Sequence, residues 1–171
     1  GDGLAVGLTT TAGESAGYVV PGTGYIPNNM LGEEDLHPRG FHTRPARQRT
    51  PTLMTPVVVL DGGQPRLVVG SGGSIRIRSA ILQTLSNLLD YQLPLSEAVN
   101  RARVHLDGEV LQCEAGYDPR AVDELEKLGY HVNRWATRSI YFGGAHSVAR
   151  TEDGRLLAAG DDRRGGATAE V

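Results

Sequence analysis

The sequence has one cysteine, one lysine and few aromatic residues, and these shortages exclude several classes of protein. A single cysteine, Cys113, allows neither an intramolecular disulfide nor a metal site built from several cysteines. Because it lies in the apolar run Val110–Cys113, we expect a buried and unreactive thiol. No apolar run reaches the ~20 residues of a transmembrane helix, and no charged-then-apolar signal segment opens the sequence.

The charge balance argues against nucleic acid and membrane surfaces as partners. The net charge is −3 at pH 7, so we expect no non-specific affinity for nucleic acid or for an anionic membrane. Lys127 is the only lysine, and we interpret the predominance of arginine mainly as a bias towards GC-rich codons. A length of 171 residues suffices for a sizeable core, and residues 1–171 are interpreted as a single domain.

Glycine is abundant, with 23 residues, and one glycine-rich stretch is the most informative part of the sequence. A strand-like run, Leu67–Val69, leads into the turn Gly70–Ser74 and then into a helical pattern. Such a turn lets backbone N–H groups converge beside a helix N-terminus, which predicts a site for an anion or a developing oxyanion. A plain tight turn is the alternative. A P-loop is excluded because no Gly-Lys-Ser/Thr follows, and the dinucleotide fingerprint fails at Ile75.

A second unusual stretch lies upstream, at residues 21–35. It places two amides, Asn28 and Asn29, and three carboxylates, Glu33, Glu34 and Asp35, on a predicted loop. Asparagines are common in turns and loop acids are usually only solvated. Taken with the glycine-rich turn, however, the stretch suggests one pocket with an electrophilic end and an ammonium-binding end.

Hydrophobic periodicity predicts the remaining elements. We expect strands at 4–11, 55–60, 66–69, 131–135, 146–150 and 155–159. We expect helices from 74 or 79 to about 91, from Ser96 as N-cap to about 101, and from Asp118 as N-cap to a stop at Gly129. Strands dominate and helices lie between them, which is typical of an α+β or α/β protein with a layered sheet.

The first fifty residues are predicted to be mostly irregular. Residues 1–3 have turn chemistry, so residues 4–11 are expected to form the second arm of a hairpin. The partner arm would precede residue 1, and the sequence therefore looks like a portion of something larger. Residues 12–36 are expected to form a glycine-rich loop. Residues 37–51, with four arginines and three prolines, favour an exposed connection over a basic recognition patch.

The histidines do not indicate a metal site. Their spacing matches no metal-ligand pattern, so each is interpreted as a loop or packing residue, and neither a catalytic metal nor a cofactor is expected. The five positions are His37, His42, His105, His131 and His146.

The motifs described above resemble, in their order and spacing, the small subunit of γ-glutamyltransferases. The matching stretches are Pro-Gly-Thr-Gly at 21–24, Asn-Asn at 28–29, the acidic cluster at 33–35, residues 52–56 and the turn 70–74. Further matches occur at 82–83, 87–91, 97–98, 103–105 and in the tail 160–167. The resemblance covers essentially the whole chain.

The resemblance implies an α+β fold of the N-terminal-nucleophile hydrolase type, in which an αββα sandwich is made partly by the small subunit. It implies a self-cleaving precursor whose new N-terminal threonine attacks the γ-amide of glutathione or a related compound. The resulting γ-glutamyl-enzyme then passes its acyl group to water or to an amino acid. That threonine would lie upstream of residue 1, so we expect the 171-residue chain alone to be inactive. The missing large subunit is the implied partner, and apolar surface bared by its absence predicts self-association.

The resemblance also assigns roles to individual residues. Gly73 and Ser74 match the pair whose N–H groups form the oxyanion hole, with Gly72 as the alternative if the register slips. Thr11 matches the threonine that supports the nucleophile. The remaining matches concern substrate binding: Asn29 in the pocket, Glu33 or its rival Glu34 on the substrate α-ammonium, and Thr52 near the substrate carboxylate.

Three positions depart from the family pattern. Gly13 replaces an asparagine that helps to hold the substrate carboxylate, and Leu53 replaces a serine with the same role. Met30 stands where glutamate or glutamine is common. A changed acyl donor follows as a hypothesis.

Two other functions remain open from the sequence. One is an acylase of the same fold that cleaves a glutaryl-type amide; the retained Glu33 and Glu34 argue against it, and the weakened carboxylate contacts leave it open. The other is a non-catalytic scaffold or binding subunit. The compartment, whether periplasmic, secreted or cytoplasmic, is not determined by the sequence.

Overall fold

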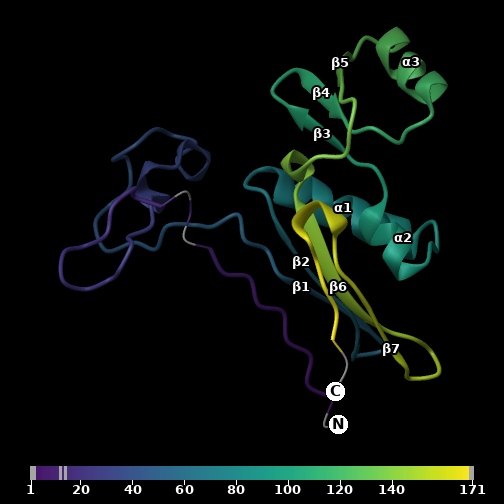
Figure 1. Ribbon diagram of the computed structural model, residues 1–171, viewed down its shortest axis with the longest axis horizontal. Coiled ribbons are helices and arrows are strands. Elements are labelled where there is room, and N and C mark those ends of the chain that lie inside the picture. The colour runs from purple at the N-terminus through teal and green to yellow at the C-terminus, as the bar shows by residue number, and fades with distance from the viewer. Residues whose placement is uncertain (1–2, 12, 14, 170–171) are drawn as a thin grey trace.

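A computed structural model describes residues 3–11, 13 and 15–169 (Figure 1). Its strands are β1 (Val57–Asp61), β2 (Gln64–Gly72), β3 (Val104–Asp107), β4 (Val110–Cys113), β5 (His131–Arg134), β6 (Gly144–Arg150) and β7 (Leu156–Ala159). Its helices are α1 (Arg76–Leu89), α2 (Leu95–Asn100) and α3 (Pro119–Lys127). Four short 3-10 turns, η1 to η4, lie at Met30–Gly32, Glu34–Leu36, Ile140–Phe142 and Asp162–Arg164. The expected α+β class is confirmed.

The main sheet is antiparallel, with strand order β1-β2-β6-β7. Because side chains alternate along a strand, Leu67, Val69 and Ser71 of β2 are buried on one face, against α1 and α2. Helix α1 turns Ile77 and Ile81 towards this face. These elements supply one helix layer and one sheet of the expected sandwich (Figure 1).

A second sheet, β3-β4-β5, lies beyond α1 and carries α3 (Figure 1). Its strands β3 and β4 form a hairpin, and β5 pairs with β4 in parallel after the α3 crossover. The predicted start of α3 is confirmed, since the Asp118 side chain caps the Arg120 amide at 2.9 Å and Pro119 opens the helix. Cys113 on β4 is buried, as expected, and burial raises the pKa of its thiol.

The predicted strand at 4–11 is wrong. Its described residues belong to no strand of the structure. Gly7 faces Val68, and Thr9 faces Gly70, so this segment lies across the second face of β2. Because β1 and β6 already occupy both hydrogen-bonding edges of β2, β2 offers no further edge with which a segment on its face could pair.

Two helix starts also differ from the prediction. Helix α1 begins at Arg76 because Gly73 and Ser74, with φ of 128° and 52°, are not helical. Helix α2 begins at Leu95, so Ser96 lies inside it and Pro94 occupies the N-cap, with φ −54° and ψ 144°. In the described part of the chain, no helix has the length and apolar character needed to cross a membrane.

Candidate functional site

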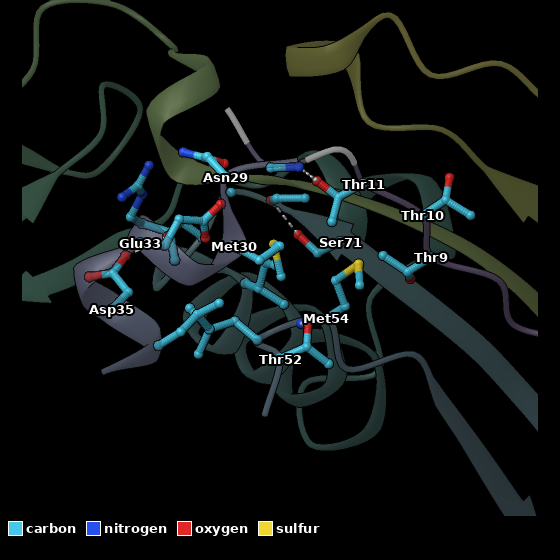
Figure 2. A pocket seen from close by; sticks show the side chains of 18 of the residues that line it. Thr9, Thr10, Thr11, Asn29, Met30, Glu33, Asp35, Thr52, Met54 and Ser71 are labelled. Atoms are coloured by element: carbon cyan, nitrogen blue, oxygen red, sulfur yellow. Dashed lines mark hydrogen bonds between the residues drawn. The ribbon is translucent and has the colours of Figure 1, made fainter. Parts of the chain in front are cut away.

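The glycine-rich turn and the acidic loop border one cavity of about 530 Å³ (Figure 2). Its walls come from five parts of the chain: residues 9–11 with 13, residues 29, 30 and 32–36, residues 52–54, residues 71–74 with 76 and 77, and Arg164. All eight residues proposed from the sequence line it, namely Thr11, Asn29, Glu33, Glu34, Thr52, Gly72, Gly73 and Ser74. The structure brings these residues together; their individual roles stay predictions.

Gly73 and Ser74, in the turn after β2, both line this cavity. Neither the Gly73 nor the Ser74 N–H donates a hydrogen bond to any described residue. Glycine is required at 73, because φ is 128° and a Cβ would lie 2.8 Å from the Cα of Gly143. The turn therefore offers two donors and an adjacent helix start, an arrangement that can stabilise an oxyanion.

The turn is also bonded to the acidic loop. Ser74 Oγ donates to Asp35 Oδ2 at 2.6 Å, which links positions 39 residues apart. Sequence reasoning placed Asp35 in the acidic cluster but assigned it no role.

The acidic end of the cavity is shaped by the absence of a side chain at residue 13. A Cβ on Gly13 would lie 2.6 Å from Glu33 Oε1 and would overlap the Asn29 amide oxygen. The space of the missing side chain is thus filled by Asn29 and Glu33, which lie together in Figure 2. Glu33 is half-buried whereas Glu34 is exposed, although both line the cavity.

Thr11 and Thr52 form mainly local contacts. Thr11 Oγ1 accepts from the Gly13 amide at 3.0 Å, and Thr52 Oγ1 accepts from the Met54 amide at 3.1 Å. Leu53, Met54 and Met30 give this side of the cavity an apolar lining. A substrate chain of a few methylene groups would therefore find apolar contact between the two polar ends.

Behind the turn lies a buried network of four charged side chains, Arg103, Glu114, Asp161 and Arg163, each at most 3% exposed. Arg103 donates to Asp161 Oδ2 at 2.7 Å, and Arg163 pairs with both carboxylates. Burial would raise the pKa of Asp161, but Arg103, Arg163 and two backbone amides outweigh it and hold the pKa below its usual value.

This network fixes the chain segment that supports the turn. Arg103 donates to the Phe142 carbonyl at 3.1 Å, and the Ala145 amide donates to Asp161 at 2.8 Å. Gly143 lies between these two anchors and packs against Gly73. Sequence patterns did not reveal the network, because its members come from loops and strand ends far apart in the chain.

The site contains no candidate metal centre. In residues 3–11, 13 and 15–169, no group of three His, Cys, Asp or Glu side chains is placed to hold an ion. Among the described residues, the buried ring nitrogens of His37 have no hydrogen-bond partner, and His105 Nδ1 lies 2.7 Å from Ser79 Oγ.

The whole chain, residues 1–171, matches the γ-glutamyltranspeptidase family. It is 34% identical over 141 residues to the acylase ACY 1 proenzyme of Pseudomonas sp. strain SE83, covering 82% of this chain and 25% of that protein. It is 30% identical over 168 residues to the glutathione hydrolase proenzyme of Bacillus subtilis strain 168, covering 96% and 28%.

The fold agrees with these relationships. The γ-glutamyltranspeptidase from Pseudomonas nitroreducens complexed with L-DON superposes with a TM-score of 0.82 and 27% identity, over 99% of this chain and 95% of the solved one. The chain spans between a quarter and a third of the length of the curated relatives cited. On sequence and fold together, this chain belongs to the γ-glutamyltranspeptidase family, whose structures are of the N-terminal-nucleophile hydrolase type.

Proposed function

We propose that this chain carries the oxyanion-binding and substrate-binding groups of an enzyme that cleaves γ-glutamyl amides such as glutathione. The cavity is the observation that carries the proposal. Its lining includes the backbone amides of Gly73 and Ser74, which donate no hydrogen bond to the residues that the structure describes, and it has an acidic end at Glu33 and Glu34. An amide carbonyl and an α-ammonium group are the matching substrate features.

In the proposed reaction the nucleophile is an N-terminal threonine in the part of the protein that precedes residue 1. Its α-amine takes the hydroxyl proton while the oxygen attacks the γ-carbonyl carbon. The carbonyl oxygen becomes an oxyanion and accepts hydrogen bonds from the N–H groups of Gly73 and Ser74. When the tetrahedral intermediate collapses, its C–N bond breaks and the α-ammonium gives its proton to the leaving amine. A γ-glutamyl-threonine ester remains. Water or an amino acid then attacks the ester and regenerates the hydroxyl.

The other site residues act on binding and orientation in this proposal. Glu33, the more buried of the two glutamates, accepts from the substrate α-ammonium, with Glu34 beside it. Asn29 and Thr52 contact the polar atoms around the substrate α-carbon, and Thr11 supports the nucleophile. A carboxylate suits the ammonium because a cation leaving water needs a charged acceptor.

The proposal includes a partner. Both relatives described above are proenzymes much longer than this chain, so we infer that a large subunit from the same precursor completes the cavity. Residues 1–171 then form the small-subunit portion, and the isolated chain is expected to show no turnover and to self-associate through uncovered apolar side chains. Val58, Val148 and Leu156 are examples, each more than 40% exposed.

A glutaryl-amide acylase is the second candidate, and specific observations favour it. Two acylase proenzymes are 34% and 33% identical to this chain. In addition, Gly13 and Leu53 lack the polar side chains that the family uses near the substrate carboxylate. Such an acylase would share the oxyanion turn but would not need an ammonium site.

The full-length precursor decides between these candidates. After maturation, γ-glutamyl-p-nitroanilide and glutaryl-p-nitroanilide are offered separately, and the release of p-nitroaniline is measured. We expect faster release from the γ-glutamyl compound and a mass increase of one γ-glutamyl group on the new N-terminal threonine peptide. Preference for the glutaryl compound supports the acylase, and no release from either compound contradicts both candidates.

A further inference from the structure

Arg164 lies between the candidate cavity and a second hollow. It ends η4 and lines both the cavity described above and a hollow of about 560 Å³ on the open face of the main sheet. The two spaces share Thr9, Thr10, Ser71 and Gly72 as well as Arg164. A group bound by Arg164 would therefore reach the turn that presents the oxyanion amides.

Two glycines make room for this side chain. Gly72 of β2 and Gly144 of β6 are register partners in the sheet. A Cβ on Gly72 would lie 3.2 Å from Arg164 Cζ, and one on Gly144 would lie 2.7 Å from Arg164 Cγ. The arginine thus lies flat on the sheet over a pair of positions that have no side chain, which restricts where its guanidinium can point.

The guanidinium of Arg164 has no hydrogen-bond or ion-pair partner in the described chain. Its neighbours are engaged. Arg163 is buried against Glu114 and Asp161. Arg76, the other arginine of the cavity, donates to the Tyr141 carbonyl at 3.2 Å and stacks on the Tyr141 ring at 4.8 Å. Of the two arginines that line this cavity, Arg76 is held by its Nε bond and ring contact with Tyr141, whereas the Arg164 guanidinium makes no hydrogen bond or ion pair with a described residue.

We propose that Arg164 binds a carboxylate of the small-molecule substrate, a specificity role that rests on the function proposed above. Guanidinium pairs with carboxylate through two parallel N–H···O bonds, which gives both charge and geometry. Arg164 Cζ lies 3.2 Å from the place of a Cβ on Gly72. Adding the covalent path from that Cβ to the Gly73 nitrogen places Cζ within about 7 Å of this nitrogen. An extended five-carbon dicarboxylic acyl group separates its carboxyl carbons by about 5 Å, so one end can meet the oxyanion amides while the other meets Arg164.

This assignment accounts for the loss of family contacts at Gly13 and Leu53. Those positions lie on the walls formed by residues 9–11, 13 and 52–54, whereas Arg164 reaches the cavity from the C-terminal tail. The carboxylate belongs either to the acyl donor or to the amino acid that accepts the acyl group. Both sources present the same chemistry to the guanidinium, and kinetics separates them.

The test uses the full-length, matured enzyme and three variants. Arg164→Met removes the charge, Arg164→Lys keeps it without the planar fork, and Arg155→Met is the matched control in the β6–β7 turn, where Arg155 pairs with exposed Asp153. The donors are γ-glutamyl-p-nitroanilide and 4-aminobutyryl-p-nitroanilide, which lacks the α-carboxylate. The acceptors are a free amino acid and its amide.

If the donor carboxylate binds, Arg164→Met raises KM for the γ-glutamyl donor about 10- to 100-fold. KM for the 4-aminobutyryl donor stays unchanged. For the γ-glutamyl donor, the KM of Arg164→Lys lies between those of the wild type and Arg164→Met. If the acceptor carboxylate binds, hydrolysis is unchanged and only transfer to the free amino acid weakens. Equal effects on compounds with and without the carboxylate overturn the inference. So does failure of both Arg164 variants to mature, which would assign the guanidinium to the protein's own assembly.

Glutarate binding, measured by calorimetry on the same proteins, separates this inference from the proposed function. A wild-type enzyme that cleaves neither amide contradicts the function. Glutarate affinity that falls about 10-fold or more in Arg164→Met, and not in Arg155→Met, supports the carboxylate site whatever the activity. Unchanged glutarate affinity in Arg164→Met contradicts a donor-carboxylate site even in an active enzyme, and unchanged transfer to the free amino acid as well contradicts the whole inference.

Discussion

Replacing Asp161 with asparagine tests whether the buried charge network holds the oxyanion turn in place. Asp161 is completely buried and accepts hydrogen bonds from Arg103, Arg163 and the amides of Ala145 and Arg163. Asparagine keeps the shape but removes the negative charge. The Arg103 guanidinium then loses its ion-pair partner, while Arg163 keeps Glu114. Breaking a buried pair in this way costs about 3–5 kcal/mol of unfolding free energy.

The assay is urea unfolding of the matured full-length protein at pH 7, with kcat and KM measured under native conditions. We expect the large loss of stability together with a fall in kcat, because Gly143 is anchored by this network and packs against Gly73. Asp153→Asn, at an exposed ion pair with Arg155, is the control and should leave the midpoint unchanged. A loss below about 1 kcal/mol for Asp161→Asn, the size of one neutral hydrogen bond, would refute the reasoning.

The pH dependence of the unfolding free energy tests the role of Asp161 in a second way. The pKa of Asp161 is lowered in the folded protein, so its ionised form stabilises the fold above the ordinary value of 3.8. That contribution is lost as the pH falls through the lower folded pKa. As the pH falls below 3.8, the Asp161→Asn variant should therefore lose less unfolding free energy than the wild type does.

Three further predictions concern the turn and the buried thiol. Gly73→Ala should lower kcat by about 10²- to 10³-fold with little change in KM, whereas Gly63→Ala, also at positive φ but with open space around it, should leave turnover intact; equal activity of both variants would contradict the oxyanion assignment. Ser74→Ala and Asp35→Ala should lower kcat/KM to a similar extent, and the double variant should be no worse than either, because each removes the same hydrogen bond. Additive losses would show that the bond does not act as a unit. Cys113 should resist iodoacetamide at pH 8 in the native protein and react after unfolding, as mass spectrometry of the peptide can show, because burial raises its thiol pKa; rapid native labelling would place the thiol in contact with solvent.

Local chemistry predicted the elements whose signals lie within a few residues. The cap at Asp118 and the stop near Gly129 bound α3 as expected, and the apolar runs around 57–60 and 66–69 became β1 and β2. Strand β3 was not among the expected elements, because Val104–Asp107 is only four residues long and gives a weak strand signal. The extended chain at 4–11 has a strand-like composition, yet pairing depends on a free neighbouring edge, which composition does not report.

The cavity is a different case. The resemblance to a family supplied its residues, and their meeting in space depends on five segments that no local pattern connects. Asp35 and Arg164 were missed for a physical reason: their contacts are with residues 39 and more than 90 positions away, at Ser74 and Gly72. The buried ion network was missed likewise, since arginine and aspartate near turns usually face solvent.

The pair Gly72 and Gly144 beneath Arg164 offers a simple way to change which substrates this protein selects. A methyl group at Gly144 would occupy the place of the arginine stem without touching the neighbouring hydrogen-bond ladder. The side chain would swing outward, and the wall it covers would become neutral and apolar. One small-to-small replacement in a strand could thus reset which molecules are accepted, while the reacting groups keep their geometry.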